Sequence, residues 1–442
     1  MKTDLTESIE WVNTLPPTWN VKRLDALAIV KARLGWKGLK AEEYVEEGYI
    51  FLSTPNLKGD DIDFENVNYI TKARYDESPE IMLREGDVLM VKDGATLGIV
   101  ALVKSLPAPA TVNGSTAVIR STNDCDSRFL YHWLRSQGIQ QLIEKMKGGM
   151  GVPHLFQSDL RRFPVALPPI PDQQRIAAYL DEQTEKIDRL MDMRRRQMAL
   201  LKEQRSALIQ QAVTRGLNPN VPMKDSGLPW LGEIPEHWEI VCLKHLCSHI
   251  VDCLHATPDY TDDGEYPAIR TADIEPGVMH ITKAKKLRYT DYLNQIQRLA
   301  PKGGDIVYSR EGERFGIAAC VPPNVDLCIS QRMMHFRCRS ENSSEFIMWQ
   351  LNTHTVYIQA LQCVFGATSP HINVETVRNY LLTEPPLSEQ REIVAFINAE
   401  TQKTDRLLLA YHRQLTLLTE YRAALIHECV TGQRLLPEAT SP

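Results

Sequence analysis

Two stretches of the sequence carry a helical pattern of apolar positions that is too long for one compact domain. Segments 172–215 and 388–431 contain neither proline nor glycine and are rich in helix-favouring residues. Apolar residues recur in both at steps of three, four or seven, which predicts one face of an amphipathic helix. In the first segment this stripe comprises Ile176, Leu180, Ile187, Leu190, Met191, Met198, Leu201, Leu208 and Ala212. In the second it comprises Ile393, Ile397, Thr404, Leu407, Leu408, Leu415, Leu418, Leu425 and Cys429.

The helical segments belong to an internal repeat that spans the chain. Pro153-His154 recurs as Pro370-His371, an offset of 371 − 154 = 217 residues, and the helical segments keep this offset without a gap. Upstream, the motif Leu-Pro-x-x-Trp at 15–19 pairs with Ile-Pro-x-x-Trp at 234–238. The part of each repeat before the helix mixes short β-rich runs with Gly, Pro and Asn turns, which predicts a compact α/β domain. The period therefore indicates two domains, each followed by a long helix.

The long helices need a partner along their whole length. A helix of about 44 residues extends for about 65 Å, so a globule of about 150 residues cannot cover the stripe. Because a pseudo-twofold axis would relate the repeats, we expect an antiparallel coiled coil between the two helices, with a globule at each end. The residues predicted to pair the helices are Ile176, Leu180, Ile187, Leu201, Leu208, Ile393, Ile397, Leu408, Leu418 and Leu425. A coiled coil between two copies of the chain is the alternative, since the stripe does not name its partner.

The predicted fold class is α+β, with two pseudo-repeated α/β domains joined by two long helices. Asp172 and Ser388 are the expected N-caps, and Gly216 and Gly432 stand where the helices should stop. The expected parts are a first domain at 1–170, a helix at 171–216, a second domain at 217–387, a helix at 388–432 and a tail at 433–442.

Composition favours a globular protein of the cytoplasm. The chain has 442 residues with 43% hydrophobic and 24% charged, and no apolar run is long enough to predict a membrane span. A polar, acidic N-terminus does not resemble a signal peptide, and nine cysteines, an odd number, fit reduced thiols. The net charge of −6 argues mildly against nucleic-acid binding, although local basic patches occur at 283–288 and at Arg332, Arg337 and Arg339.

Motifs for catalysis are absent from the sequence. An adenine methyltransferase would need a glycine-rich cofactor loop and an Asn-Pro-Pro-aromatic motif, and an ATPase would need a phosphate-binding loop. The chain contains none of these, so we expect no catalysis and no cofactor in this chain. Cysteine and histidine are dense between Cys242 and His255, but the matching stretch 23–36 of the first repeat contains neither residue type. A strand and turn are therefore favoured there over a zinc site, which stays open as the alternative.

Two motifs resemble those of a known family. The segment Asp-Ser-Gly-Leu-Pro-Trp-Leu-Gly-Glu-Ile-Pro-Glu-His-Trp at 225–238 resembles the opening of a target-recognition domain in specificity subunits of type I restriction-modification enzymes. Pro-Pro-Leu-Ser-Glu-Gln-Arg at 385–391, before a helix that closes on Val-Thr-Gly, resembles the conserved helical region of that family. The first copy departs from the pattern, with Ile-Pro-Asp-Gln-Gln-Arg at 170–175. The resemblance covers nearly the whole chain.

This resemblance implies a division of labour. Each globule would be a target-recognition domain that reads one half of a bipartite site in double-stranded DNA, while the helices set the spacer and dock two modification subunits. Those partners would carry S-adenosylmethionine and methylate adenine at N6, and restriction subunits using ATP and Mg would complete a nuclease for defence against foreign DNA. The target bases and the spacer length do not follow from the sequence.

The best candidates for DNA contact are loops that occur in both repeats. Glycine-rich loops let backbone N–H groups approach phosphate, and basic or hydroxyl side chains add donors, although such loops can equally be plain turns. The candidates are Lys92, Thr96, Lys147, Gly148, Gly149, His154, Arg310, Arg314, Arg332, Gly366, Thr368, Ser369 and His371. Two other functions compete: a coiled-coil scaffold without a DNA role, and a self-sufficient DNA enzyme. Two divergent globules argue against the first, and the missing cofactor motifs argue against the second.

Overall fold

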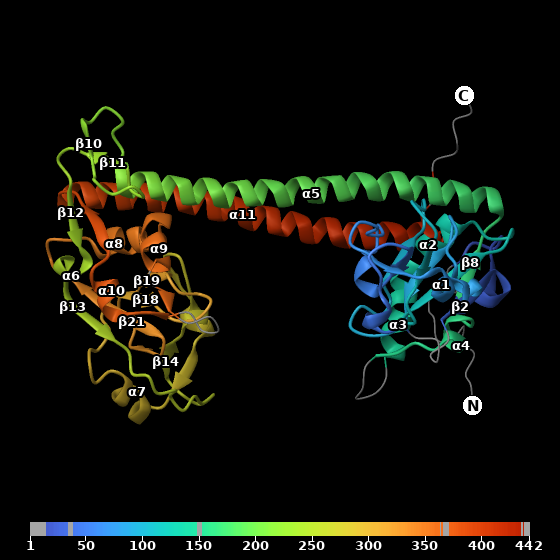
Figure 1. Cartoon of the computed structure of the whole chain (residues 1–442), viewed down its shortest axis with the longest axis horizontal. Helices are drawn as coiled ribbons and strands as arrows, with labels where there is room; N and C mark the ends of the chain where they lie inside the picture. The colour runs from blue at the N-terminus through green and yellow to red at the C-terminus, as the bar shows by residue number, and fades with distance from the viewer. Residues whose placement is uncertain are drawn as a thin grey trace. The chain divides into compact units, whose positions relative to one another are not determined.

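The chain divides into two units that each hold one globule and parts of both long helices. The computed structural model describes residues 15–33, 39–147, 153–362, 364–365, 371–434 and 436. Unit 1 comprises 1–194 with 412–442, and unit 2 comprises 195–411. The long helices are α5 (Ile170–Arg215) and α11 (Leu387–Val430), shown in Figure 1. Each unit therefore contains the first half of one long helix and the last half of the other.

Both long helices begin slightly earlier than the sequence analysis predicted. Asp172 and Ser388 lie inside the first turn, so the prediction that they are N-caps was wrong. Proline is tolerated in the first turn of a helix, where its missing N–H is not needed, so Pro171 does not delay the start of α5. At the other ends, Gly216 and Gly432 have φ of 73° and 71°, as expected for glycines that stop a helix.

The globule of unit 1 contains two larger sheets and one two-stranded sheet. A four-stranded sheet has the order β2-β8-β5-β6, a three-stranded sheet the order β4-β3-β7, and β1 pairs with β9. The strands are β1 (Asn20–Arg23), β2 (Ala28–Ala32), β3 (Tyr49–Leu52), β4 (Asn68–Ile70), β5 (Val88–Val91), β6 (Val100–Leu102), β7 (Ala110–Val112), β8 (Thr116–Ser121) and β9 (Pro164–Leu167). The short helices are α1 (Lys72–Asp76), α2 (Ser127–Arg135), α3 (Gln137–Met146) and α4 (Gln157–Leu160).

The globule of unit 2 repeats this topology. Its sheets β13-β21-β18-β19, β17-β14-β20 and β12-β24 match the three sheets of unit 1, including one parallel pair in each three-stranded sheet. The matching strands are β12 (Glu239–Cys242), β13 (Cys247–Asp252), β14 (Tyr266–Ile269), β17 (Lys285–Leu287), β18 (Ile306–Ser309), β19 (Ala318–Cys320), β20 (Cys328–Ile329), β21 (Met333–Cys338) and β24 (Leu381–Glu384). Short additional pairs are β10 (Met223–Asp225) with β11 (Glu233–Pro235), β15 (Ile274–Glu275) with β16 (Val278–Met279), and β22 (Val364–Phe365) with β23 (His371–Ile372).

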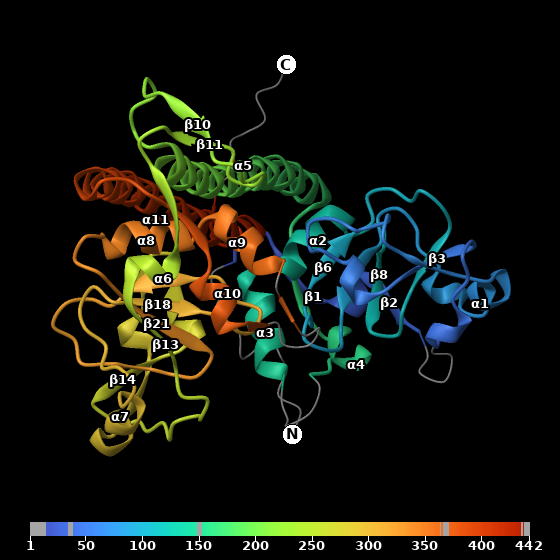
Figure 2. The same cartoon turned by 60° about the vertical axis from the view of Figure 1, so that its left-hand side comes forward.

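Helices cover one face of each four-stranded sheet. The short helices of unit 2 are α6 (Leu243–Leu246), α7 (Tyr289–Gln295), α8 (Ser344–Leu351), α9 (His354–Leu361) and α10 (Val374–Arg378). In this unit α8 and α9 lie between the sheet and the long helices (Figures 1 and 2). The central strand β5 of unit 1 alternates between two cores: Val88 and Met90 face the core shared with the long helices, whereas Leu89 and Val91 face a second core under the three-stranded sheet. Each globule is thus a proximal layer on the helices and a distal lobe.

Within each unit the two long helices run side by side in opposite directions. In unit 1 the Arg422 guanidinium of α11 pairs with Asp188 of α5, and in unit 2 Arg205 of α5 pairs with Asp405 of α11. Asp405 is equivalent to Asp188 in the repeat, and Arg205 is equivalent to Arg422, so the two ion pairs are equivalent with α5 and α11 exchanged. An antiparallel pair of helices related by a pseudo-twofold axis requires this exchange. All ten predicted pairing residues are buried or half-buried, and those nearest a globule also pack on its proximal core.

The apolar stripe is narrower than the sequence suggested. Leu190 and Leu407 are 44% and 45% exposed, although both were placed on the buried stripe. Successive residues on a helix point about 100° apart, and the neighbouring Met191 takes the inward position. Among the described residues, no helix is long and apolar enough to span a bilayer.

The Pro-x-x-Trp motifs explain how each globule meets the end of a long helix. In both repeats the backbone N–H of the tryptophan donates to the backbone carbonyl of the proline at 2.9 Å, forming a tight turn. The ring of Trp238 then lies against Gly216, and that of Trp19 against Gly432; a Cβ on either glycine would be 3.3 Å from the indole. Each motif therefore closes on the helix that comes from the other repeat.

A glutamine at the start of each long helix holds the neighbouring short helix. The Gln173 side chain accepts from the backbone N–H of Asp126, the N-cap of α2, at 2.8 Å, and its amide donates to the Pro168 carbonyl at 2.8 Å. Gln390 makes the same two bonds to Ser343 and Pro385 in unit 2. Both glutamines are buried, so these bonds fix the angle between globule and helix.

Candidate nucleic-acid interface

The candidate loops of the first repeat come together at one end of the four-stranded sheet. β5 ends at Val91, and the turn that follows pairs with the segment after α3 through an isolated antiparallel bridge between Asp93 and His154. The Leu155 N–H donates to the Lys92 carbonyl at 2.8 Å. Two loops that are about sixty residues apart in the sequence therefore form one surface.

The second repeat builds the same surface from different side chains. Glu311 and His371 form the matching antiparallel bridge, and the Ile372 N–H donates to the Arg310 carbonyl at 3.0 Å. Gly94 and Gly312, at equivalent places in the two turns, have φ of 88° and 83°, a region that glycine adopts without strain. Gly148, Gly149, Gly366, Thr368 and Ser369 were also predicted to contact DNA, and they lie outside the described residues.

In the first repeat the surface is polar with one exposed ring. The Lys92 ammonium is mostly buried and pairs with Asp93 at 2.8 Å, while His154 pairs with the other oxygen of Asp93. Thr96 is exposed at the tip of the turn, and Lys147, half-buried at the end of α3, pairs with Glu144 at 2.5 Å. Phe156 is 61% exposed and packs edge-on against the His154 ring at 4.5 Å between centroids.

In the second repeat the arginines have unequal roles. Arg310 is only 6% exposed; its guanidinium makes two bonds of 2.9 Å with Asp252 and one of 2.8 Å with Glu311. These contacts hold it inside the domain, where it supports the loop. Arg314 is exposed and its guanidinium donates to the Ile274 carbonyl at 2.7 Å; Arg332 and His371 are exposed as well.

Arg332 stands out by its backbone. Its φ of 72° is unusual for a residue with a long side chain, and its carbonyl accepts the Arg310 N–H at 3.2 Å. The conformation turns the exposed guanidinium toward the Gly312 turn: a Cβ on Gly312 would lie 3.9 Å from Nη1 of Arg332. Strained backbone of this kind is concentrated at binding sites.

One partly buried ion pair in each globule fixes the four-stranded sheet at the start of its central strand, the end away from the loops. Asp87 pairs with Arg120 and Asp305 with Arg337, each at 2.7 Å. In unit 2 the buried His335 is a second side-chain partner of Asp305, at 2.7 Å. Burial raises the pKa of the Asp305 carboxyl, but hydrogen bonds from His335 and Arg337 outweigh this effect and hold the pKa well below its ordinary value. Arg337, which the sequence placed in a basic patch, is therefore committed to this ion pair.

The dense cysteine and histidine stretch forms the end of β12, the short helix α6 and the strand β13, so a single helical turn stands where a turn was predicted. Cys247 lies in β13 opposite Cys338 of β21, and His255 pairs with Asp252 at 2.9 Å. Burial raises the pKa of the Cys253 thiol, which disfavours the thiolate that zinc binds. Within the described parts of the chain, no three potential ligand side chains gather, and the eight cysteines they include are free thiols.

Two features of this interface could not be inferred from the sequence. Asp252 fixes Arg310 from a strand 58 positions earlier, a contact that only the β13–β21 pairing brings about. Phe156 was passed over because one aromatic residue in a loop carries no pattern. Its position two residues after the recurrent Pro-His dipeptide was the only available signal.

Comparison with known proteins identifies the layout. A family model described as the type I restriction modification DNA specificity domain matches residues 16–197 and again 235–408. The specificity subunit of the type I restriction enzyme MjaVIII from Methanocaldococcus jannaschii is 23% identical over 426 residues, which cover 95% of this chain and 93% of that protein. The specificity subunit of the type I restriction enzyme EcoKI from Escherichia coli is 18% identical, with 95% and 90% covered.

Solved structures share the fold. One chain from work on complex assembly and conformational transition of the type I R-M system aligns with a TM-score of 0.71 at 19% identity, covering 95% of this chain and 99% of that one. The HsdS subunit of Thermoanaerobacter tengcongensis aligns with a TM-score of 0.50 at 18% identity, with 95% and 98% covered. Both alignments extend through the two globules and the long helices.

Proposed function

Since the chain belongs to the type I restriction-modification DNA specificity family, we propose that it selects a bipartite DNA sequence as a non-catalytic subunit, with one globule per half-site. The carrying observation is that both globules build the same loop surface, through the bridges Asp93–His154 and Glu311–His371, with different side chains around it. Two loop surfaces with the same backbone and different side chains are suited to the recognition of two different base sequences by one molecule. A scaffold without a DNA role would not need this difference.

The proposed DNA contacts are residues of the loop surfaces that are exposed or half-exposed. In the first domain they are Thr96, Lys147 and His154; in the second they are Arg314, Arg332 and His371. Arginine can bind guanine through two hydrogen bonds in the major groove, and lysine suits phosphate. We assign Lys92 and Arg310 to positioning, because each is largely buried and paired with a carboxylate.

The long helices are proposed to set the distance between the half-sites. Both are uninterrupted over more than forty residues, and the ion pairs Arg422–Asp188 and Arg205–Asp405 fix their register at matching levels. A pair of rigid helices of fixed register holds its attached domains at a fixed separation, so bases between the half-sites need not be read.

The exposed sides of the helix pair are proposed to dock two modification subunits. In unit 1 an apolar groove of about 350 Å³ is lined by Leu190, Arg194, Gln414, Leu417, Leu418 and Tyr421. In unit 2 the equivalent side chains Leu407 and Leu200 are exposed as well. Exposed apolar side chains that recur at both ends of a pseudo-twofold pair fit two copies of the same partner. Those partners would supply S-adenosylmethionine and adenine methylation, and restriction subunits would supply ATP-dependent cleavage with Mg, all in the cytoplasm.

The test combines the purified chain with its modification subunit. Alone, the chain should show no methyltransferase, ATPase or nuclease activity; with the modification subunit, it should direct adenine methylation to one bipartite sequence. Sequencing of methylated adenines in treated DNA measures this result. Methylation by the chain alone, or methylation of a single uninterrupted sequence, would contradict the proposal.

A further inference from the structure

Four charged side chains join the first recognition domain to both long helices within unit 1. Asp60 lies in the loop between a turn at Thr54–Asn56 and β4, and its carboxylate pairs with Arg135 at the end of α2 and with Arg422 of α11. Arg422 also grips Asp188 of α5 through two bonds of 2.9 and 3.1 Å. We call Asp60, Arg135, Arg422 and Asp188 the ionic joint.

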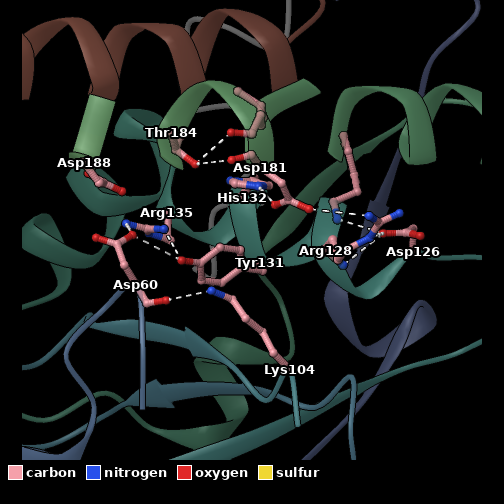
Figure 3. Close-up of polar contacts among 12 residues, drawn as sticks. Asp60, Lys104, Asp126, Arg128, Tyr131, His132, Arg135, Asp181, Thr184 and Asp188 are labelled. Atoms are coloured by element: carbon pink, nitrogen blue, oxygen red, sulfur yellow. Dashed lines mark hydrogen bonds and ion pairs between the residues drawn. The ribbon is translucent and has the colours of Figure 1, made fainter. Parts of the chain in front are cut away.

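Neighbouring polar contacts hold the joint in place, as Figure 3 shows for the labelled side chains. The Tyr131 hydroxyl donates to the Gly59 carbonyl at 3.1 Å, and the Lys104 ammonium donates to the Asp60 carbonyl at 3.3 Å. The buried His132 ring, also on α2, contacts the Asp181 carboxylate of α5 at 2.7 Å. The loop that carries Asp60 is thus fixed by its backbone as well as by its carboxylate.

The two arginines of the joint are largely buried, whereas its carboxylates Asp60 and Asp188 are 50% and 36% exposed. The Arg135 and Arg422 side chains are 13% and 14% exposed. Although partial burial raises it, Arg135 and Arg422 lower the pKa of the Asp60 carboxyl below its ordinary value. Partly buried ion pairs of this kind are screened less by salt than pairs on the open surface.

The joint attaches a part of the domain that the apolar seam does not reach. The loop around Asp60 belongs to the distal lobe, since Leu57 and Ile62 on either side of it pack in the second core. The seam between α2 and α5, by contrast, belongs to the proximal core. The proximal core already includes Leu425 and Ile426 of α11, so the joint adds a contact between α11 and the distal lobe, which restrains movement of that lobe against the helices.

The second recognition domain has no equivalent joint. At the repeat offset, Gly277 replaces Asp60 and Trp349 replaces His132, and a Cβ on Gly277 would be 2.5 Å from the Trp349 ring. Asn352 replaces Arg135 and bonds to the backbone of Ala318 instead. In the described part of unit 2, Arg205 pairs with Asp405 alone, at 3.6 Å. In this domain the distal lobe is held by packing of Gly277 on Trp349 of α8, while polar contacts such as that of the Thr383 hydroxyl with the Val213 carbonyl at 2.7 Å join the proximal layer to α5.

We propose that the ionic joint is a positioning device that sets the orientation of the first recognition domain on the helix pair, and thereby the spacer at which the first half-site is accepted. The inference rests on the proposed bipartite recognition. Its residues touch no DNA; they act through the placement of the loop surface. The two domains therefore differ in what holds the distal lobe: ion pairs to α2 and α11 in the first domain, and a tryptophan of α8 packed on glycine in the second.

The test compares Asp60→Asn and Arg422→Gln with the matched control Arg205→Gln, which removes the equivalent helix pair without a joint. Each variant is purified with the modification subunit. Methylation rates are measured on duplexes carrying the mapped wild-type target and on duplexes whose spacer is one base pair shorter or longer. The readout is the ratio of the rate on the wild-type spacer to the rate on the shifted spacers, because a loss of folded protein lowers both rates and leaves the ratio unchanged.

Misplacement by an ångström can change a rate by about a hundredfold, so a loosened joint should lower this ratio by at least about tenfold in both joint variants and leave it unchanged in Arg205→Gln. If Arg422→Gln does not fold, Asp60→Asn still decides, because its side chain is half-exposed and its shape is kept. Unchanged ratios in the joint variants, or an equal fall of the ratio in Arg205→Gln, would overturn the inference. The proposed function would still stand in that case if the wild-type complex methylates a bipartite site. A wild-type complex without a bipartite site would overturn both.

Discussion

Lengthening both helices by one heptad should lengthen the unread spacer by about three base pairs. The insertions are made after Met198 in α5 and after Leu415 in α11, which are equivalent positions in the repeat. Met198 is buried on the apolar stripe, and seven residues return the stripe to the same phase. Seven residues at 1.5 Å each add about 10.5 Å, and base pairs are stacked about 3.4 Å apart. Both half-sites should keep their sequences, because neither globule is changed.

The assay maps methylated adenines with the lengthened chain and its modification subunit. An insertion of four residues at the same places is the control, since it turns the stripe away from its partner and should lower the melting temperature instead. Three added base pairs also rotate the half-sites by about a third of a turn, so reduced activity at the longer spacer is expected. An active, well-folded heptad variant with the original spacer would refute the view that the helices measure the site.

Three further predictions concern single side chains. Arg332→Ala should weaken recognition of the second half-site alone, by about 1 to 3 kcal/mol if the guanidinium contacts a base, and altered preference in both half-sites in methylation maps would contradict this. Leu417→Asp and Leu200→Asp, at equivalent exposed positions, should each remove one modification subunit from the complex, weakening that site by about tenfold or more; native mass measurements that still find two subunits would rule out the groove. Asp305→Asn should destabilise the second domain by about 3 kcal/mol at pH 7, because it leaves Arg337 unpaired. Since the folded pKa of Asp305 is depressed, wild-type stability from this group is full above about pH 4 and is lost below it, so denaturation curves of variant and wild type should converge in acid.

The repeat made much of the fold predictable from the sequence. An offset shared by helices, loops and the Pro-x-x-Trp motifs predicted two equivalent globules, two long helices and two loop surfaces, and the antiparallel register follows from the same symmetry. The prediction was wrong in detail where neighbouring residues compete, as at the inward Met191 and outward Leu190. Periodicity identifies a stripe but does not choose between adjacent apolar positions.

The candidate site was predictable only as far as the backbone. Both repeats carry the loops, so their positions could be inferred, but the sequence does not say which arginine is exposed. Arg310 and Arg314 look alike in the sequence, yet Asp252 buries the first from a distant strand while the second stays exposed. The ionic joint could not be inferred for the same reason, because its four charges come from segments that are far apart in the chain and only two of their equivalents in the second repeat, Arg205 and Asp405, are charged.

The seams at the helix ends bear on how such a chain can change by inheritance. Trp19 on Gly432 and Trp238 on Gly216 use the same residue types at the same spacing, and Gln173 and Gln390 make the same bonds to the short helix beside them. Exchange of a whole globule between genes at these matching borders would therefore leave the contacts at the helix end unchanged. Under the proposed function, the new globule would bring a new half-site, while the helix surfaces proposed to bind protein partners would stay the same.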